Sequence, residues 1–456
     1  MQAPAAHDVF AAALPADRIL PGDANDDYAH DEALNSTPVT PRAVLLPETT
    51  DEVARILRTA DDHRIPVTAR GSGTGLSGAA VPHPDGIVIS FERMKRIEID
   101  VDNQVAIVQP GVTLQELDKV TAEHGLTYPV YPGEYSASLG GNVATNAGGM
   151  RAVKYGVTRH QVLGLEAVLA SGDVIRTGGR FVKGSTGYDL TQLIIGSEGT
   201  LAVVTEAILR LYPRPDHSAT VLAPYRTLDE VMHAVPRIVA SGIGPLIVEY
   251  IDLLTMGGMV KAFDLDLGVP QEIQDEALAY LVIVMENAHE SRLDEDVQQL
   301  AQHMSELGAM DVYVLPSGAG QRLIEAREKA FWLAKGAGAD DIIDIVVPRA
   351  SIADYMAAVK AISDATGTFV AGCGHAGDGN VHLSVYKADP DERSAVLKQL
   401  FEAGMALGGV ISGEHGIGTT KRKYFLELED PVKLDVLRRI KAAFDPNDIL
   451  NPGTVF

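Results

Sequence analysis

The chain has 456 residues, more than one hydrophobic core usually accommodates, so we expect at least two domains. Hydrophobic residues make up 46% of the sequence and charged residues 22%, a balance that excludes a largely disordered chain. The formal net charge is −24, so the surface repels phosphate backbones, and we exclude nucleic acid as a partner. An anionic substrate must therefore be bound by a few local cations.

Cys373 is the single cysteine, so the chain can form neither an internal disulfide nor a zinc site built from cysteines. Residues 1–20 lack the basic start and apolar stretch of a signal peptide, and no apolar run reaches the roughly 18 residues of a membrane helix. We therefore expect a cytoplasmic protein with no integral membrane segment. Association with the periphery of the inner membrane and formation of a homodimer both stay open.

The first half of the chain has the pattern of an α/β unit. Residues 49–60 combine a threonine cap, early acidic residues and apolar residues at helical spacing, and they predict a helix. Segments 66–70 and 87–90 predict strands on either side of a glycine-rich turn. A second glycine-rich region covers 128–149, and no proline occurs between residues 133 and 212.

Pro213 and Pro215 end this pattern and predict a domain boundary. Beyond them, apolar strand candidates alternate with amphipathic helices, which is typical of a separate α+β domain. The predicted strands are 246–251, 280–285, 312–315 and 368–371, and the predicted helices are 294–307, 351–365 and 431–444.

The segment from Arg70 to Gly78 contains the G-x-G-x-x-G pattern of a dinucleotide-binding turn. That fingerprint requires a long helix after its third glycine, and Pro82 and Pro84 prevent one here. What remains is a loop of small residues whose backbone N–H groups can approach a pyrophosphate. The alternative is a glycine-rich structural turn. Small residues and amide side chains at 136–149 indicate a second place where the backbone passes close to something flat or bulky.

Two histidines, His375 and His382, flank a glycine-rich bend, and Glu414 and His415 follow some thirty residues later. Two imidazoles and a carboxylate are typical of a catalytic divalent metal site that leaves positions open for substrate. Each histidine taken singly would more often be a core or turn residue, but the cluster favours a metal site. Asp378 and Asn380 in the bend are expected to form the turn, and Cys373 to be an inert buried thiol.

Together these motifs resemble the FAD-binding type-4 oxidases and dehydrogenases. That family has the vanillyl-alcohol oxidase fold and includes D-lactate, glycolate and D-2-hydroxyglutarate dehydrogenases. The resemblance covers most of the chain and rests on six motifs in order, at 66–78, 132–155, 196–201, 374–382, 413–418 and 450–453. It implies an α+β protein of two domains, an FAD-binding domain (residues 1–214, with 415–456 returning to it) and an antiparallel-sheet cap, or substrate, domain (215–414).

The resemblance also implies roles for individual residues. FAD is expected to be noncovalent, because the first glycine loop has no histidine for attachment, although His160 leaves a covalent link open. One divalent metal, with zinc favoured, would be held by His375, His382 and Glu414, and His415 would be the base. The implied cofactor-binding residues are Arg70, Gly71, Ser72, Gly73, Thr74, Gly75, Leu76, Ser77, Gly78, Pro132, Gly133, Ser138, Gly141, Asn142, Thr145, Gly148, Gly149, Glu198, Thr200 and Asn451.

Arg327 would pair with the substrate carboxylate, and a solvated surface arginine is the alternative. Trp332 lies nearby and is either a pocket wall or a core residue. Members of the family that act on 2-hydroxyglutarate resemble one another in having a threonine and a lysine that bind the distal carboxylate of the substrate. In this sequence those two positions correspond to Phe331 and to about Ile342. A bulky apolar pair cannot stabilise a second buried carboxylate, so we expect a monocarboxylate substrate.

The sequence therefore predicts FAD-dependent oxidation of a D-2-hydroxy monocarboxylic acid, such as D-lactate or glycolate, to the 2-keto acid. The metal would acidify the hydroxyl, His415 would take its proton, and flavin would take the hydride. Alternatives are a D-2-hydroxyglutarate-type dehydrogenase, a flavoenzyme for phenols or ether-linked substrates, a nicotinamide dehydrogenase, and a non-catalytic or electron-transfer flavoprotein subunit of a larger oxidase complex. The electron acceptor stays open among a quinone, an electron-transfer flavoprotein, a cytochrome and an iron–sulfur subunit.

Overall fold

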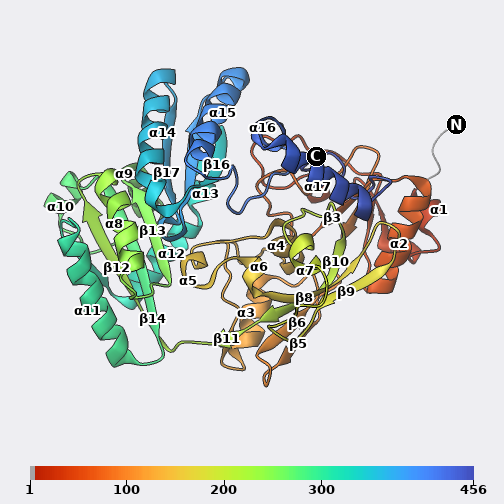
Figure 1. Cartoon of the computed structure of the whole chain (residues 1–456), viewed down its shortest axis with the longest axis horizontal. Coiled ribbons are helices and arrows are strands. Elements are labelled where there is room, and N and C mark those ends of the chain that lie inside the picture. Colours follow the sequence, from red (N-terminus) through yellow and green to blue (C-terminus); the bar gives the residue numbers. More distant parts are fainter. Residues whose placement is uncertain (1–5) are drawn as a thin grey trace.

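The computed structural model describes residues 6–456, which form two lobes side by side (Figure 1). One lobe contains a four-stranded and a five-stranded sheet, and the other contains a single seven-stranded sheet. Within the described residues, no helix is both long enough and apolar enough to cross a membrane.

The four-stranded sheet has the order β1-β2-β4-β3, with β1 antiparallel and the other strands parallel. Helix α2 begins after Thr49, whose side chain accepts a hydrogen bond from the N–H of Glu52, and it buries an apolar stripe against this sheet. The predicted helix and both predicted strands are thus confirmed, and the glycine-rich turn after β3 leads into no helix. The elements are β1 (Ile19–Pro21), β2 (Ala43–Leu45), α2 (Thr50–His63), β3 (Val67–Arg70) and β4 (Ile87–Ser90), preceded by α1 (Ala6–Phe10).

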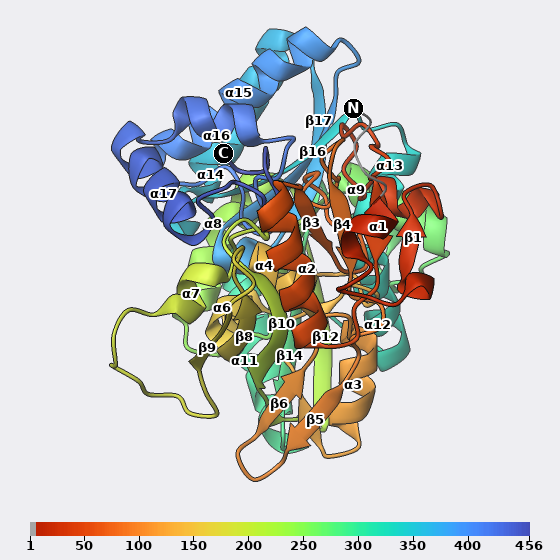
Figure 2. The same ribbon diagram turned by 90° about the vertical axis from the view of Figure 1, so that its right-hand side faces the viewer.

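The five-stranded sheet is antiparallel in the order β5-β6-β10-β8-β9. Its strands are β5 (Ile97–Asp100), β6 (Val105–Val108), β8 (Val162–Val168), β9 (Val174–Gly178) and β10 (Val203–Arg210), and β7 (Leu126–Thr127) pairs separately with β11 (Tyr212–Pro213). The helices of this lobe are α3 (Leu114–Ala122), α4 (Leu139–Thr145), α5 (Ala152–Tyr155), α6 (Thr158–Gln161) and α7 (Leu190–Ile194). The loop between β9 and α7 projects from the body of the molecule (Figure 2).

The seven-stranded sheet is antiparallel throughout, in the order β15-β12-β14-β13-β17-β18-β16. Helices cover both faces, so alternate side chains of one strand enter different cores: Leu281 and Ile283 of β14 pack on one face, and Tyr280 and Val282 pack on the other. This double burial explains why the central strands read as unbroken apolar runs.

The four strands predicted in this half are present as β13 (Ile247–Asp252), β14 (Ala279–Asn287), β15 (Tyr313–Leu315) and β17 (Phe369–Gly374). Three further strands were not predicted: β12 (His217–Tyr225), β16 (Asp341–Val346) and β18 (Asn380–Tyr386). Of these, β16 and β18 carry charged or polar residues inside the sheet, so their sequences do not show the unbroken apolar run of a buried strand. The helices are α8 (Leu228–Ala240), α9 (Leu253–Phe263), α10 (Gln271–Glu276), α11 (Glu290–Glu306), α12 (Ser317–Glu328), α13 (Ala330–Gly336), α14 (Ile352–Thr366) and α15 (Pro390–Ala406).

The C-terminal segment runs back to the first lobe (Figure 1). After α16 (Arg422–Leu428) and α17 (Pro431–Phe444), Leu450 forms a parallel bridge with Val67 of β3. The buried Lys441 Nζ donates to the carbonyl oxygens of Thr200 and Leu450, at 3.0 Å and 2.9 Å. The predicted helix at 431–444 is confirmed.

Candidate active site

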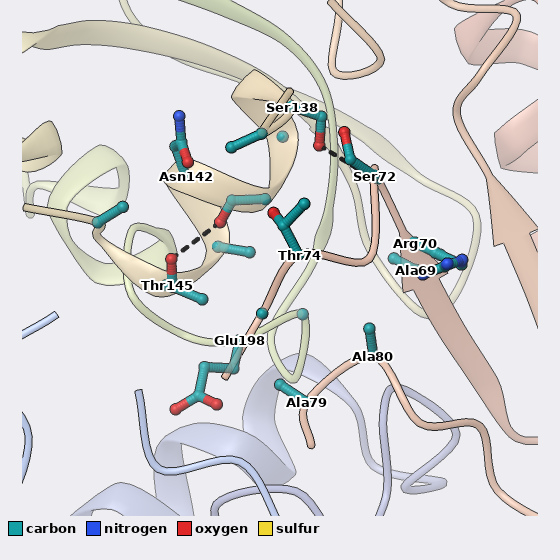
Figure 3. Close-up of a pocket in the computed structure, with 18 of the residues that line it drawn as sticks. Ala69, Arg70, Ser72, Thr74, Ala79, Ala80, Ser138, Asn142, Thr145 and Glu198 are labelled. Carbon is teal, nitrogen blue, oxygen red and sulfur yellow. Dashed lines mark hydrogen bonds between the residues drawn. The ribbon is translucent and has the colours of Figure 1, made fainter. Parts of the chain in front are cut away.

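The glycine loop after β3 and helix α4 face each other across a cavity in the first lobe (Figure 3). The cavity has about 1290 Å³ of empty space, part of it open to solvent. Ser72 and Thr74 reach it from the loop, and Asn142 and Thr145 reach it from α4. Fourteen of the predicted cofactor-binding residues line this cavity: Arg70, Gly71, Ser72, Gly73, Thr74, Gly75, Leu76, Ser77, Pro132, Ser138, Gly141, Asn142, Thr145 and Glu198.

The walls of this cavity carry hydrogen-bond donors without acceptors. Among residues 6–456, no group accepts a hydrogen bond from the backbone N–H groups of Gly73 to Ser77. The buried Nη1 of Arg70 and Nδ2 of Asn142 also have no hydrogen-bond partner in the described chain. Buried donors are almost always satisfied in a working protein, so this set fits a bound anion such as the pyrophosphate of FAD.

The loop also requires glycine for steric reasons. A Cβ on Gly71 would lie 1.8 Å from Ser138 Oγ, and Gly73 has φ +73°. The backbone of the loop therefore approaches α4 more closely than any side chain would permit.

Six predicted cofactor residues do not line this cavity: Gly78, Gly133, Gly148, Gly149, Thr200 and Asn451. Asn451 instead joins the C-terminal segment to the cavity wall, because its Nδ2 donates to the carbonyl oxygens of Ala79 and Glu198, each at 2.9 Å. The Glu198 carboxylate accepts from the N–H groups of Ile417 and Gly418, at 2.8 Å and 2.7 Å. Burial raises the pKa of Glu198 to about 7 although these bonds oppose the rise.

A second cavity lies between helices α12 and α13 and the seven-stranded sheet, with about 1280 Å³ of empty space that is partly open. Arg327, Phe331 and Ile342 all line it. The two cavities have four lining residues in common: Leu76, Pro132, Glu414 and His415. Glu414 and His415 therefore lie where the cavities meet, and His375 and His382 line the second cavity.

His375, His382 and Glu414 form one cluster, and their candidate ligand atoms all lie within 4.8 Å of one another. The Nε2 atoms of His375 and His382 are 3.2 Å and 3.3 Å from Glu414 Oε1. The antiparallel pairing of β17 with β18 places Cys373 opposite His382, and this register brings the two histidines together across the bend. Two imidazoles and a carboxylate at this spacing fit one divalent metal ion.

A fully buried carboxylate, Glu249 on β13, links this cluster to Arg327. Its Oε1 is 2.6 Å from His375 Nδ1, and its Oε2 is 2.7 Å from Arg327 Nη2. Burial lowers the pKa of His375, but the carboxylates of Glu249 and Glu414 outweigh it and raise that pKa to about 10. Arg327 is itself buried, so it is not a solvated surface arginine.

A second buried carboxylate, Asp344 on β16, holds the loop that carries Glu414 and His415. Its Oδ2 accepts from the backbone N–H groups of Gly413, Glu414 and His415, at 2.9 Å, 2.7 Å and 2.9 Å. Its Oδ1 is 2.5 Å from Lys421 Nζ and 3.5 Å from His415 Nδ1. Burial dominates at His415 and lowers its pKa to about 4, so its imidazole is neutral at pH 7.

Both halves of the chain match known protein families. Residues 41–178 match the FAD binding domain family, and residues 214–455 match the family described as FAD linked oxidases, C-terminal domain. The chain belongs to the FAD-linked oxidase family. It is an FAD-linked oxidoreductase, which confirms the predicted family and enzyme class.

Relatives of this FAD-linked oxidoreductase match along nearly their whole length. An uncharacterized FAD-linked oxidoreductase of Mycobacterium tuberculosis is 57% identical over 440 residues, 96% of each chain. A D-lactate dehydrogenase of Archaeoglobus fulgidus is 41% identical, covering 94% of this chain and 96% of its own. The glycolate oxidase subunit GlcD of Bacillus subtilis is 39% identical, covering 91% and 89%. The solved structure of p-cresol methylhydroxylase, at 20% identity, aligns over 98% of this chain and 95% of its own with a TM-score of 0.78, so the two-domain fold is shared.

Glu249 and Asp344 belong to none of the motifs of the sequence, although the sequence does carry a signal for both. Each is an acidic residue inside an apolar strand, at I-V-E-Y-I and I-I-D-I-V. A carboxylate in a strand buried on both faces is costly unless it is paired, so such a position points to a buried partner. What the sequence lacked was the identity of that partner.

We expect the Gly71→Ala variant to lose FAD. The new Cβ would overlap Ser138, so the loop must move away from α4, at a cost that lowers FAD affinity by roughly tenfold or more. The ratio of flavin to protein absorbance of the purified enzyme measures this loss. Gly257→Ala is the control, because nothing lies within 4 Å of its Cβ position. Equal flavin content in the two variants would contradict the predicted role of the loop.

Proposed function

We propose that this FAD-linked oxidoreductase oxidises a D-2-hydroxy monocarboxylic acid, such as D-lactate or glycolate, to the corresponding 2-keto acid. The observation that carries the proposal is the His375–His382–Glu414 cluster with His415 and Arg327 around one cavity that adjoins the cofactor cavity. The names of relatives, D-lactate dehydrogenase and a glycolate oxidase subunit, support the same substrate class.

We propose residues 1–214 and 415–456 as the FAD-binding domain and 215–414 as the cap domain. The change from the five-stranded to the seven-stranded sheet after β11 supports the first boundary. The bridge between Leu450 and Val67 supports the return of the C-terminal segment.

In the proposed mechanism His375, His382 and Glu414 hold one divalent metal, with zinc as the first candidate. A metal ion held there would act as a Lewis acid and lower the pKa of the substrate hydroxyl. His415 accepts the hydroxyl proton at Nε2, because its Nδ1 faces Asp344 at 3.5 Å. Asp344 thus orients the ring and stabilises the imidazolium that forms.

Arg327 is proposed to bind the substrate carboxylate. Its Nε has no hydrogen-bond partner in the described chain and is available to the ligand, while Glu249 restrains Nη2 from the other side. Among the described residues lining this cavity, Arg327 is the single arginine or lysine. Phe331 and Ile342 cannot neutralise a second carboxylate, so a monocarboxylate fits better than a diacid.

FAD is proposed to bind noncovalently in the first cavity and to supply the oxidant that accepts the hydride of the substrate carbon. His160 does not line that cavity, and His415 is the one histidine of the described chain that does. The remaining predicted cofactor residues Gly78, Gly133, Gly148, Gly149, Thr200 and Asn451 are proposed to support the shape of the cavity rather than to contact FAD.

Anaerobic titration with a panel of 2-hydroxy acids tests the substrate class. We expect D-lactate or glycolate to bleach the flavin, and L-lactate and D-2-hydroxyglutarate to do so at least about a hundredfold more slowly. Treatment with a chelator should abolish bleaching, and zinc or another divalent ion should restore it. Rapid bleaching by D-2-hydroxyglutarate would favour the diacid alternative, and unchanged bleaching after verified metal removal would exclude the metal mechanism.

His415→Ala should slow flavin reduction by about 10² to 10⁴-fold, because the hydroxyl proton loses its acceptor. The variant should keep its metal and its FAD, since His415 is not among the proposed metal ligands and is one of many residues that line the FAD cavity. Stopped-flow reduction at saturating substrate measures the rate, and elemental analysis measures the metal. Reduction at the parental rate would remove His415 as the base.

Glu249→Gln should weaken the metal site and the carboxylate site together. A neutral amide at this position cannot give His375 and Arg327 an anionic partner, so we expect metal affinity to fall about 10 to 100-fold. Competition with a chelator measures the metal affinity, and KM for the hydroxy acid should rise as well. Glu249→Asp, which keeps the charge, should recover part of both, and recovery of neither would indicate a purely structural role.

A further inference from the structure

A third hollow opens where the two lobes meet, and we define it by four aromatic residues as the aromatic vestibule. Tyr131 and Tyr135 come from the loop before α4, and Phe263 and Trp332 come from α9 and α13. The hollow has about 770 Å³ of empty space, part of it open to solvent. The ring centroids of Tyr131 and Tyr135 are 4.1 Å apart.

Tyr135 and Trp332 are 41% and 43% exposed. Lys329 lies over the Phe263 ring, and Lys335 lies over one part of Trp332. The open aromatic surface of the hollow therefore comes mainly from Tyr135 and Trp332. Exposed aromatic surface in a hollow indicates a ligand site.

The vestibule adjoins both cavities of the candidate active site. It shares Glu134 with the cofactor cavity. It shares Gly133, Glu328 and Leu333 with the cavity that contains Arg327. A molecule in the vestibule would therefore lie against the walls of both.

We propose that the aromatic vestibule binds the planar ring of a quinone, which reoxidises the enzyme after each turnover. Four aromatic side chains can contact a flat, uncharged ring. The lining also includes the charged residues Glu134, Glu328 and Lys329, of which Lys329 and the protonated form of Glu328 can donate hydrogen bonds to the ring's oxygens. The net charge of −24 does not repel such a ring. A concave hollow of this size suits a small molecule. The proposal deepens the proposed function, on which it rests for the source of the electrons.

Reduction of a quinone requires protons as well as electrons, and Glu328 in the wall of the vestibule can supply one. The quinone would take two electrons from the reduced cofactor and two protons, one from the Glu328 carboxyl and one from solvent, and it would leave as the hydroquinone. The proton that the cofactor loses on reoxidation would pass to solvent. Solvent in the open vestibule then returns the proton to Glu328. Burial raises the pKa of Glu328 to about 7, so a protonated fraction is present at neutral pH. The Tyr131 hydroxyl donates to Glu328 Oε2 at 3.0 Å and holds this carboxyl at the wall.

Trp332 is the single tryptophan of the chain, so its fluorescence reports directly on the vestibule. We expect menadione, a soluble naphthoquinone, to quench the emission of the oxidised holoenzyme saturably, after correction for absorption with free tryptophan. Tyr135→Ala should weaken menadione binding about tenfold, which corresponds to one lost aromatic contact. The control is Tyr188→Ala, a 96% exposed tyrosine on the projecting loop of Figure 2, and it should bind as the parent does. Non-saturable quenching, or equal affinities in the two variants, overturns the proposal.

Separate measurements of flavin reduction and flavin reoxidation distinguish a quinone site in the vestibule from an entry channel for the hydroxy acid. The flavin is reduced with stoichiometric dithionite and then mixed with menadione, so the measurement does not depend on the proposed substrate. Tyr135→Ala should slow reoxidation about tenfold at subsaturating menadione and should leave flavin reduction by the hydroxy acid within about twofold of the parent. Slower reduction with unchanged reoxidation overturns the proposal and makes the vestibule the hydroxy-acid route. Failure of every hydroxy acid to bleach the flavin, with the quinone result intact, would count against the proposed substrate alone.

Discussion

A single buried carboxylate, Glu249, contacts His375 and Arg327 at once, and the arrangement of the second cavity depends on it. A charge with no exposed surface is tolerated only when it is paired, so removal of either partner would leave an uncompensated ion in the protein interior. This constraint fixes the distance between the candidate metal cluster and the candidate carboxylate-binding arginine. The orientation of a small hydroxy acid would follow from that distance.

Asp344 acts in a similar way on the other side of the cluster. It gathers three consecutive backbone N–H groups and the Lys421 ammonium around one carboxylate, and so holds the loop with Glu414 and His415 in a defined conformation. Both carboxylates lie on strands of the seven-stranded sheet, on β13 and β16. The rigid sheet therefore supplies the support, and the loops supply the reactive groups.

The two lobes contribute different chemistry. The first lobe presents a small-residue loop with unpaired N–H donors, suited to a phosphate-bearing cofactor, and the second presents imidazoles, carboxylates and one arginine. His415 and Glu414 line both cavities because the C-terminal segment crosses from the second lobe to the first at this point. The bonds of Glu198 to Ile417 and Gly418, and of Asn451 to Ala79, hold that crossing in place. The aromatic vestibule opens at the same junction.

The sequence by itself determined the family, the glycine loops, the candidate metal and base residues and six of the eighteen strands of the described chain, because these depend on local patterns and on motifs in order. It also predicted that the cysteine is buried, since a free thiol packs as a small apolar group. It did not identify Glu249, Asp344, the five-stranded sheet or three strands of the seven-stranded sheet, because their places depend on pairing between segments far apart in the chain. Only the tertiary structure decided which glycines face the first cavity and which merely permit close backbone packing, since both requirements select glycine. Folding alone also brought Tyr135 and Trp332 to the rim of one hollow, because these residues are nearly two hundred positions apart in the sequence.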